Sequence, residues 1–129
     1  MVIEHLAFQH PAPAMAAEWY CDHLGFVVAR ASNGPSQARF LADKAGRVVL
    51  EIYNNAAAPV PDYPMQSPLV LHVAFLSEDL DADCARLQAA GAVVVESPTA
   101  TPAGDVLAML RDPWGVPLQL VRRAKPLLG

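Results

Sequence analysis

Short apolar runs separated by turn residues make up most of the chain, and the same order of runs occurs twice. Residues 3–8 (IEHLAF) and 70–75 (VLHVAF) each predict a strand, because apolar and aromatic residues dominate both runs. A segment with helical spacing follows each strand and ends at Gly25 in the first copy and at Gly91 in the second. In the second copy Ser77 is expected to cap the start of this helix.

Three further strand-like runs follow each helix. The first of them is FVVAR at 26–30 in one copy and AVVVE at 92–96 in the other. A tight turn joins the last two strands, with the sequence DKAG at 43–46 and DPWG at 112–115. Asp at the first position and Gly at the fourth are typical of a type I turn. The chain therefore predicts an α+β fold made of two βαβββ modules.

A proline-rich segment separates the two copies. We expect a single domain over residues 1–129, composed of module 1 (1–55), a linker (56–68) and module 2 (69–123). Because its prolines stiffen the chain and remove backbone donors, the linker is expected to be stiff and not to form a packed element.

Four polar side chains stand among apolar neighbours at matching positions of the two copies. His5 and His72 lie in the first strand of each copy, and Glu51 and Gln119 lie between two apolar residues in the last strand. Strand side chains alternate between faces, so the bulky neighbours are expected to pack under the helix. The four polar groups then lie on the opposite face of each sheet.

These four side chains are suitable ligands for a divalent metal. A carboxylate such as Glu51 is costly to bury among apolar residues unless a partner compensates its charge. Two imidazoles, one carboxylate and one amide oxygen form a ligand set suited to Zn, Ni, Co, Fe or Mn. Taken singly, each residue has a simpler interpretation, as a hydrogen-bonded structural histidine or as a glutamate facing water. The repeated placement favours the metal.

Composition and charge narrow the range of partners. The chain has 129 residues, of which 53% are hydrophobic and 17% charged, as in globular proteins. With a net charge of −4 and no basic run, neither nucleic acid nor an anionic membrane is an expected partner. The apolar runs are too short to span a bilayer, and no segment resembles a secretory leader, so we expect a soluble cytoplasmic protein.

The remaining histidines and the cysteines are expected to be structural. His10 and His23 have no counterpart in the other copy and are expected at the surface or at a helix end. Cys21 and Cys84 both fall in helix-like segments, where buried thiols are more common than a disulfide framework.

The chain resembles the vicinal oxygen chelate superfamily, which contains glyoxalases, bleomycin-resistance proteins and ring-cleaving dioxygenases. EHLAF at 4–8, HVAF at 72–75 and EWYCDHLGF at 18–26 carry the resemblance, the last being similar to the family's FY-x-x-x-LGF. The DPWG-x-x-LQL ending at 112–120 is similar to the family's DP-x-G turn and ligand strand, and the resemblance spans residues 2–122. It implies curved mixed sheets enclosing a cleft, with a divalent ion ligated by His5, Glu51, His72 and Gln119.

Residue 119 departs from the family pattern, which usually has Glu at this position. In glyoxalase I that Glu acts as the base, whereas Gln119 can ligate through oxygen but cannot accept a proton near pH 7. Glu51 is its counterpart in the first module and is expected to be both ligand and base. The first functional expectation is therefore a metal-dependent lyase or isomerase of the glyoxalase type, which binds a small substrate through two oxygens.

The resemblance implies two alternatives. One is a non-haem iron dioxygenase of the extradiol type that uses His5, His72 and Glu51. The other is a metal-free protein that binds a drug or metabolite, as bleomycin-resistance proteins do, in a cleft with aromatic walls. The aromatic residues available for such walls are Phe40, Tyr53 and Trp114.

Two arginines and the oligomeric state complete the expectations. Arg39 and Arg111 lie in strands near the expected cleft, where they either hold a substrate carboxylate or phosphate or remain solvated. The resemblance also implies a homodimer, with the metal site formed within one chain or across two.

Overall fold

The computed structural model describes the backbone of residues 1–129 and the side chains of all of them except residues 48 and 49. The chain divides into two compact units, unit 1 (Met1–Pro61) and unit 2 (Asp62–Gly129). Unit 1 contains β1 (Leu6–Gln9), α1 (Pro13–Leu24), β2 (Val27–Ala31), β3 (Arg39–Ala42) and β4 (Val48–Tyr53). Unit 2 contains the short 3₁₀ helix η1 (Tyr63–Met65), β5 (Val73–Leu76), α2 (Leu80–Ala89), β6 (Val93–Ala100), β7 (Val106–Arg111) and β8 (Pro117–Arg122).

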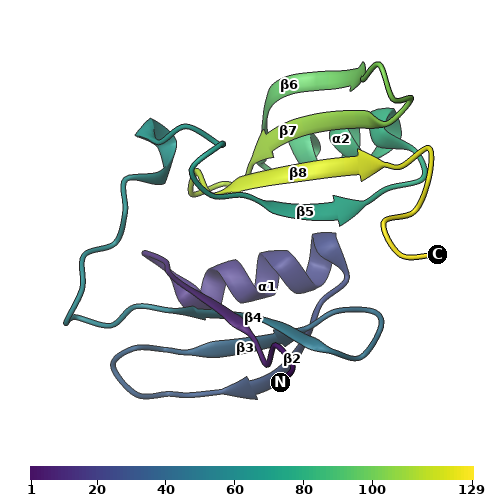
Figure 1. The fold of residues 1–129 in the computed structure, drawn as a ribbon. Helices are drawn as coiled ribbons and strands as arrows, with labels where there is room; N and C mark the ends of the chain where they lie inside the picture. Colours follow the sequence, from purple (N-terminus) through teal and green to yellow (C-terminus); the bar gives the residue numbers. More distant parts are fainter. The chain divides into compact units, whose positions relative to one another are not determined.

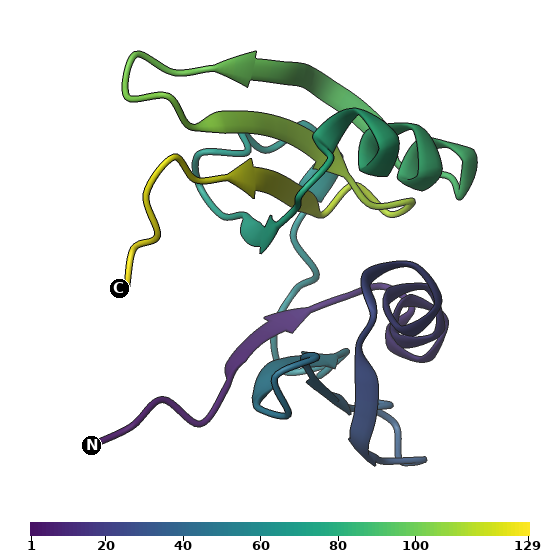
Figure 2. The same cartoon turned by 90° about the vertical axis from the view of Figure 1, so that its right-hand side faces the viewer.

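Each unit is a four-stranded mixed sheet with one helix against it. The strand order is β1-β4-β3-β2 in unit 1 and β5-β8-β7-β6 in unit 2 (Figure 1). The first strand of each unit runs parallel to the last, and the other neighbours are antiparallel. Figure 2 shows the helix of each unit lying on one face of its sheet. The predicted α+β fold of two βαβββ modules is confirmed.

The core of each unit follows the alternation of its last strand. Leu50 and Ile52 on β4 are buried, and Leu118 and Leu120 on β8 are buried in the same way. Burying a side chain of this size stabilises the fold by about 1.5–3 kcal/mol relative to exposure. The polar residue between each pair points to the other face of its sheet.

The two predicted turns have the same hydrogen-bond pattern. Asp43 Oδ1 accepts from the backbone N–H groups of Ala45 and Arg47, and Gly46 N donates to the Asp43 carbonyl. The Asp112 carboxylate does the same for Trp114 and Val116, and Gly115 N donates to the Asp112 carbonyl. Gly46 and Gly115 both have positive φ, 78° and 93°, which glycine adopts without steric cost.

The helix ends differ in how well the sequence predicts them. Gly25 adopts a left-handed conformation at the C-cap of α1, and its N–H donates to the Tyr20 carbonyl, as predicted. The prediction of Ser77 as an N-cap is wrong, because the cap of α2 is Asp79, whose Oδ1 accepts from Ala82 N at 3.0 Å. Ser77 instead donates its hydroxyl to Asp83 Oδ2 at 2.6 Å.

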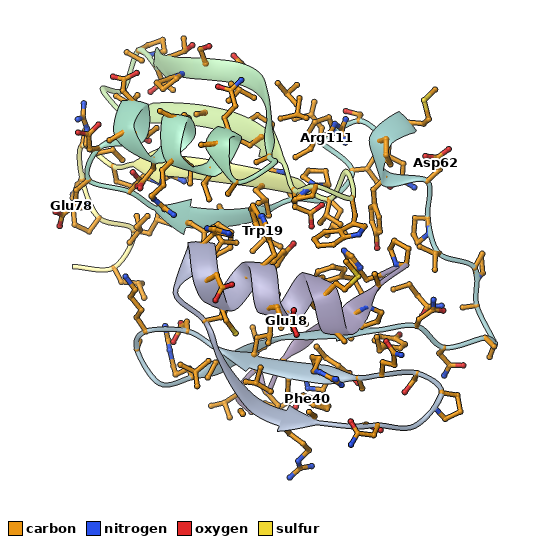
Figure 3. The ribbon with its side chains drawn as sticks, turned by 180° about the vertical axis from the view of Figure 1, so that it is seen from behind. Glu18, Trp19, Phe40, Asp62, Glu78 and Arg111 are labelled. Atoms are coloured by element: carbon orange, nitrogen blue, oxygen red, sulfur yellow. The ribbon has the colours of Figure 1, made fainter. Side chains whose placement is uncertain are left out.

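Part of the predicted linker is packed, contrary to expectation. Tyr63 begins η1 and is only 2% exposed. Arg111 holds this segment, because Nη1 donates to the Tyr63 carbonyl and Nη2 to the Gln66 carbonyl, both at 2.7 Å (Figure 3). At the other end of the segment, Gln9 Nε2 donates to the carbonyls of Asn55 and Ala58, and Gln9 Oε1 accepts from Asn55 N.

Two further local predictions need correction. Residues 68–70 form a turn, closed by a bond from Val70 N to the Ser67 carbonyl, so β5 begins only at Val73. The expectation of His10 at the surface is wrong, since it is fully buried. His10 directly follows β1. Its backbone N–H donates to the Tyr53 carbonyl, and its ring Nδ1 accepts from Ala12 N. His23 does lie in the last turn of α1, against Trp19.

Asp105 ties the C-terminal segment to the β6–β7 turn. Its carboxylate accepts from Ala124 N at 2.9 Å and from Arg123 Nη1 at 2.7 Å. These bonds, with that to the backbone of Ala124 the larger, lower the pKa of Asp105 below its usual value. Because the folded chain then favours the ionised carboxylate, Asp105 contributes stability above its usual pKa, near 4.

The Asp105→Asn variant is expected to be less stable than the wild type at pH 7, because an amide loses the charge that Arg123 pairs with. The difference in free energy of unfolding should shrink as the pH falls below about 4 and through the lowered pKa of the folded state. Urea denaturation of both proteins at pH 7, 5 and 3 measures it, with the exposed Glu78→Gln change as a control. An equal difference at all three values would contradict the assignment.

Candidate functional site

The best-defined pair of candidate side chains lies in unit 1, just before β1 and in the middle of β4. His5 Nε2 and Glu51 Oε2 are 3.1 Å apart, and their side chains are 29% and 20% exposed. The register explains the pairing, because Ala7 is opposite Glu51 and its small side chain leaves room beside the carboxylate. Two atoms that each lie about 2.1 Å from one ion in neighbouring positions are separated by about 3 Å, so this spacing fits two metal ligands.

Each of the two histidines has an oxygen atom beside its Nδ1. The carboxylate of Glu4 contacts His5 Nδ1, and the Pro68 carbonyl lies 2.8 Å from His72 Nδ1. A carbonyl oxygen only accepts, so Nδ1 of His72 carries the proton and Nε2 of a neutral ring has the free lone pair. Ligand histidines in metal sites are commonly held by such an oxygen on the other ring nitrogen.

The charge of Glu4 also affects the titration of His5. Its hydrogen bond to Nδ1 raises the pKa of His5 above the usual value, against a smaller opposing effect of desolvation, and the Glu51 carboxylate adds to the increase. His5 is therefore flanked by two carboxylates that favour a cation at this position.

Aromatic side chains flank the pair in unit 1. Phe40 on β3 is opposite Glu51 in the sheet and meets the His5 ring edge-on, with ring centroids 5.4 Å apart. Tyr53 follows Glu51 by two residues on β4, so alternation places it on the same face, and it is half-buried. The polar pair thus has an apolar wall made by its own sheet.

Unit 2 repeats this arrangement position by position. His72 precedes β5 by one residue, as His5 precedes β1, and Ala74 is opposite Gln119 as Ala7 is opposite Glu51. The half-buried amide of Gln119 makes no hydrogen bond to any other residue that the structure describes. Met109 occupies the position of Phe40, since it is opposite Gln119 across β7 and β8.

The two arginines and Trp114 lie elsewhere in their units. Arg39 is opposite Ile52 and therefore lies on the helix-covered face of its sheet, away from Glu51 and Phe40. The Arg111 guanidinium donates hydrogen bonds to three backbone carbonyls, those of Tyr63, Gly115 and Gln66. Trp114 lies half-buried in the turn before β8, with its backbone N–H bonded to Asp112.

Sequence reasoning missed two residues of this arrangement. Glu4 was overlooked although it directly precedes His5, and Met109 was overlooked although alignment of the two Asp-x-x-Gly turns pairs it with Phe40. The same alternation rule would have separated Arg39 from Phe40, because neighbouring strand residues point to opposite faces.

Each unit contributes two of the four predicted ligands. Among the described side chains, no group of three or more His, Cys, Asp or Glu residues is arranged to hold a metal. The donors present are nevertheless imidazole nitrogens, one carboxylate oxygen and one amide oxygen, which suit a borderline divalent cation. Within unit 1, the spacing of His5 and Glu51 fits two ligands of such an ion. Both cysteines are free thiols, with Cys84 buried and Cys21 half-buried.

The family model of the Glyoxalase/Bleomycin resistance protein/Dioxygenase superfamily matches residues 2–120. No curated protein sequence gives a significant match. Over the part of the chain that the structure describes, no helix is long and apolar enough to cross a membrane.

Solved structures agree with the family match. The structure of SMU.1112c is 27% identical, with a TM-score of 0.70 over 95% of this chain and 98% of that one. TnmS3, an antibiotic binding protein from Streptomyces sp. CB03234, is 25% identical, with a TM-score of 0.67 and 93% of each chain covered. A glyoxalase I variant from Zea mays shares the fold at 19% identity, with a TM-score of 0.72 over 95% of this chain and 46% of that one. The chain therefore belongs to the glyoxalase, bleomycin resistance protein and dioxygenase superfamily.

Proposed function

We propose that this protein is a metal-dependent lyase or isomerase of the glyoxalase type. In this proposal His5, Glu51, His72 and Gln119 hold one divalent ion, and a small substrate binds to the ion through two oxygens. The observation that supports it most is the His5–Glu51 pair, with 3.1 Å between Nε2 and Oε2 and a carboxylate on the other ring nitrogen.

The ligand roles follow from the side chains. When bound, a divalent ion would act as a Lewis acid and stabilise negative charge that develops on the substrate oxygens. Gln119 offers a neutral amide oxygen and cannot move a proton near pH 7. Glu51 is the carboxylate of the set, so in this proposal it takes the proton next to the substrate carbonyl and returns it to the neighbouring carbon. Phe40 and Tyr53 exclude water from one side of Glu51.

The proposal predicts that Glu51→Gln separates metal binding from catalysis. The amide keeps an oxygen ligand but loses the base, so turnover should fall by about 10²–10⁴-fold, the usual contribution of a general base. The assay follows isomerisation of the hemithioacetal of phenylglyoxal and 2-mercaptoethanol, by protein stripped with a chelator and reloaded with Ni, Co, Zn, Mn or Fe. Metal content is measured on the same samples.

The control for this experiment is Gln119→Glu, which adds a carboxylate at the equivalent position and should retain activity. Full activity of Glu51→Gln with metal bound would exclude Glu51 as the base. Oxygen consumption with catechols in place of isomerisation would assign the chain to the dioxygenases instead.

A second candidate is a metal-free binding protein for a drug-like molecule. It is favoured by the 25% identity to TnmS3, an antibiotic binding protein. In this case Phe40 and Tyr53 would form an apolar wall of the site, and chelator-treated protein would bind its ligand as well as the metal-loaded form. Fluorescence titration of both forms with a bleomycin-type glycopeptide distinguishes the two functions.

A further inference from the structure

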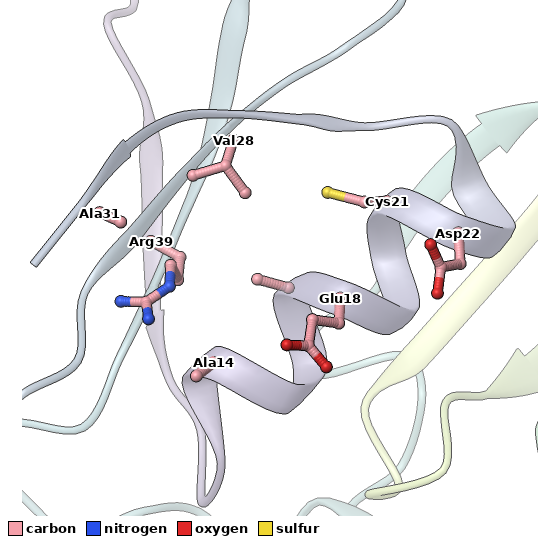
Figure 4. A pocket seen from close by; sticks show the side chains of 8 residues that line it. Ala14, Glu18, Cys21, Asp22, Val28, Ala31 and Arg39 are labelled. Atoms are coloured by element: carbon pink, nitrogen blue, oxygen red, sulfur yellow. The ribbon is translucent and has the colours of Figure 1, made fainter. Parts of the chain in front are cut away.

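A hollow lies on the opposite face of the unit 1 sheet from His5 and Glu51. It has a volume of about 420 Å³, within the range of small-molecule sites, and lies between α1 and the strands β2 and β3. Its lining, shown in Figure 4, consists of Ala14, Ala17, Glu18, Cys21, Asp22, Val28, Ala31 and Arg39.

Small side chains and a strand irregularity create this hollow. The pairing of β2 with β3 shifts between Val28 and Arg30, so Val28 is opposite Leu41 and Ala31 is opposite Arg39. The bulge therefore brings Val28 and Ala31 to the same face as Arg39, the face that α1 covers. Alanines on the helix leave the space between helix and strands unfilled.

Opposite charges line the two sides of the hollow. Glu18 and Asp22 lie one turn apart on α1, and Arg39 lies on β3, across the space from Glu18 in Figure 4. No ion pair joins either carboxylate to Arg39 within the described part of the chain. The charges are thus separated by the hollow instead of neutralising one another.

Backbone carbonyls hold the guanidinium of Arg39 in place, and some of its N–H groups remain available to a ligand. Its Nη1 donates to the carbonyls of Ser32, Gln37 and Ala38 at 2.8, 3.1 and 3.2 Å. All the side-chain hydrogen bonds that Arg39 makes with described residues come from Nη1. Its Nε and Nη2 can therefore donate to another acceptor. A carboxylate is the acceptor that a guanidinium fits best.

The state of Cys21 indicates that this hollow binds a ligand and does not carry out a thiol reaction. Burial, with the nearby Asp22 carboxylate adding to it, raises the pKa of the Cys21 thiol. The thiol therefore stays protonated near neutral pH and is not a nucleophile. It contributes a weakly polar surface beside Val28.

We propose that this hollow binds a small zwitterionic amino acid. The ligand carboxylate lies against Arg39, its ammonium group lies against Glu18 and Asp22, and a short aliphatic chain contacts Ala17, Val28 and Ala31. This site is separate from the proposed metal site, because it lies on the other face of the sheet and uses none of the same side chains.

Calorimetric titration with four probes of equal chain length tests the proposal. L-Norvaline and 5-aminopentanoate carry both charges, n-pentylamine carries only the ammonium group and pentanoate only the carboxylate. At least one zwitterion is expected to bind about tenfold tighter than either singly charged probe, the effect of one charge-assisted hydrogen bond. Binding of neither zwitterion, or equal binding of a singly charged probe, would overturn the proposal.

Variants locate the binding and separate it from the metal site. Glu18→Gln removes a charge from an exposed helix position, where the fold is tolerant, and should weaken the zwitterion about tenfold. Glu78→Gln removes an exposed charge in unit 2 and should leave affinity unchanged (Figure 3). Glu51→Gln should also bind normally, so failure of the metal proposal would not affect this result. Unchanged affinity in Glu18→Gln would count against the assigned site.

Discussion

Replacement of His5 by alanine is expected to abolish stoichiometric binding of the divalent ion. Changes to residues that only support metal ligands cost about 10–100-fold in affinity, so loss of a ligand should cost at least as much. His72→Ala should have the same effect, because the two histidines occupy equivalent positions one residue before β1 and β5. Elemental analysis of protein dialysed against a limiting metal concentration measures the loss.

His23→Ala is the matched control for these variants. His23 lies in the last turn of α1 and is half-buried, like His5 and His72. Its replacement removes an imidazole without altering β1 or β4. The variant should retain wild-type metal content. Wild-type occupancy in both His5→Ala and His72→Ala would refute the metal site and leave the metal-free binding protein as the better function.

Gly115→Ala is expected to be among the most damaging single changes to the stability of the fold. At this position φ is +93°, and an added Cβ would lie 2.4 Å from Pro64 Cγ and 2.8 Å from Pro64 N. The left-handed conformation alone costs an alanine roughly 1–2 kcal/mol, and displacement of the Pro64 backbone would add to it. We expect a total loss of about 3 kcal/mol or more in the free energy of unfolding.

Gly46→Ala provides the internal control, since Gly46 occupies the equivalent turn in unit 1. Its φ is +78°, yet no atom among the described residues lies within 4 Å of an added Cβ. This variant should lose only the conformational part, about 1 kcal/mol. Denaturant unfolding followed by circular dichroism compares the two, and equal losses would show that Pro64 adapts to the new methyl group.

The sequence was sufficient for the features that depend on local pattern. The two Asp-x-x-Gly turns and the Gly25 helix stop are dictated by a few neighbouring residues, so they could be predicted with their chemistry. The alternation around Glu51 and Gln119 also determined which face carries the polar groups. The repeat identified His5 and His72 as equivalent residues, but it placed both inside the edge strands, whereas each lies one residue before its strand.

Other features depend on contacts between segments that are far apart in the chain. Tyr63 is buried, and Arg111 donates to its carbonyl from β7, a long-range pairing that leaves no local signal. Asp79 replaced Ser77 as helix cap because Ser77 is already engaged by its backbone with Val121 and by its hydroxyl with Asp83. The bulge in β2, which moves Val28 and Ala31 to one face, is equally invisible in the residue pattern.

The bonds that fasten the connecting segment have a consequence for the evolution of the chain. Gln9 fixes Asn55 and Ala58 to the first sheet, and Arg111 fixes Tyr63 and Gln66 to the second. A genetic crossover within residues 59–61 would therefore leave every one of these anchors in its own half. Recombination at this point between homologous genes would exchange each sheet together with the side chains that anchor its connecting residues.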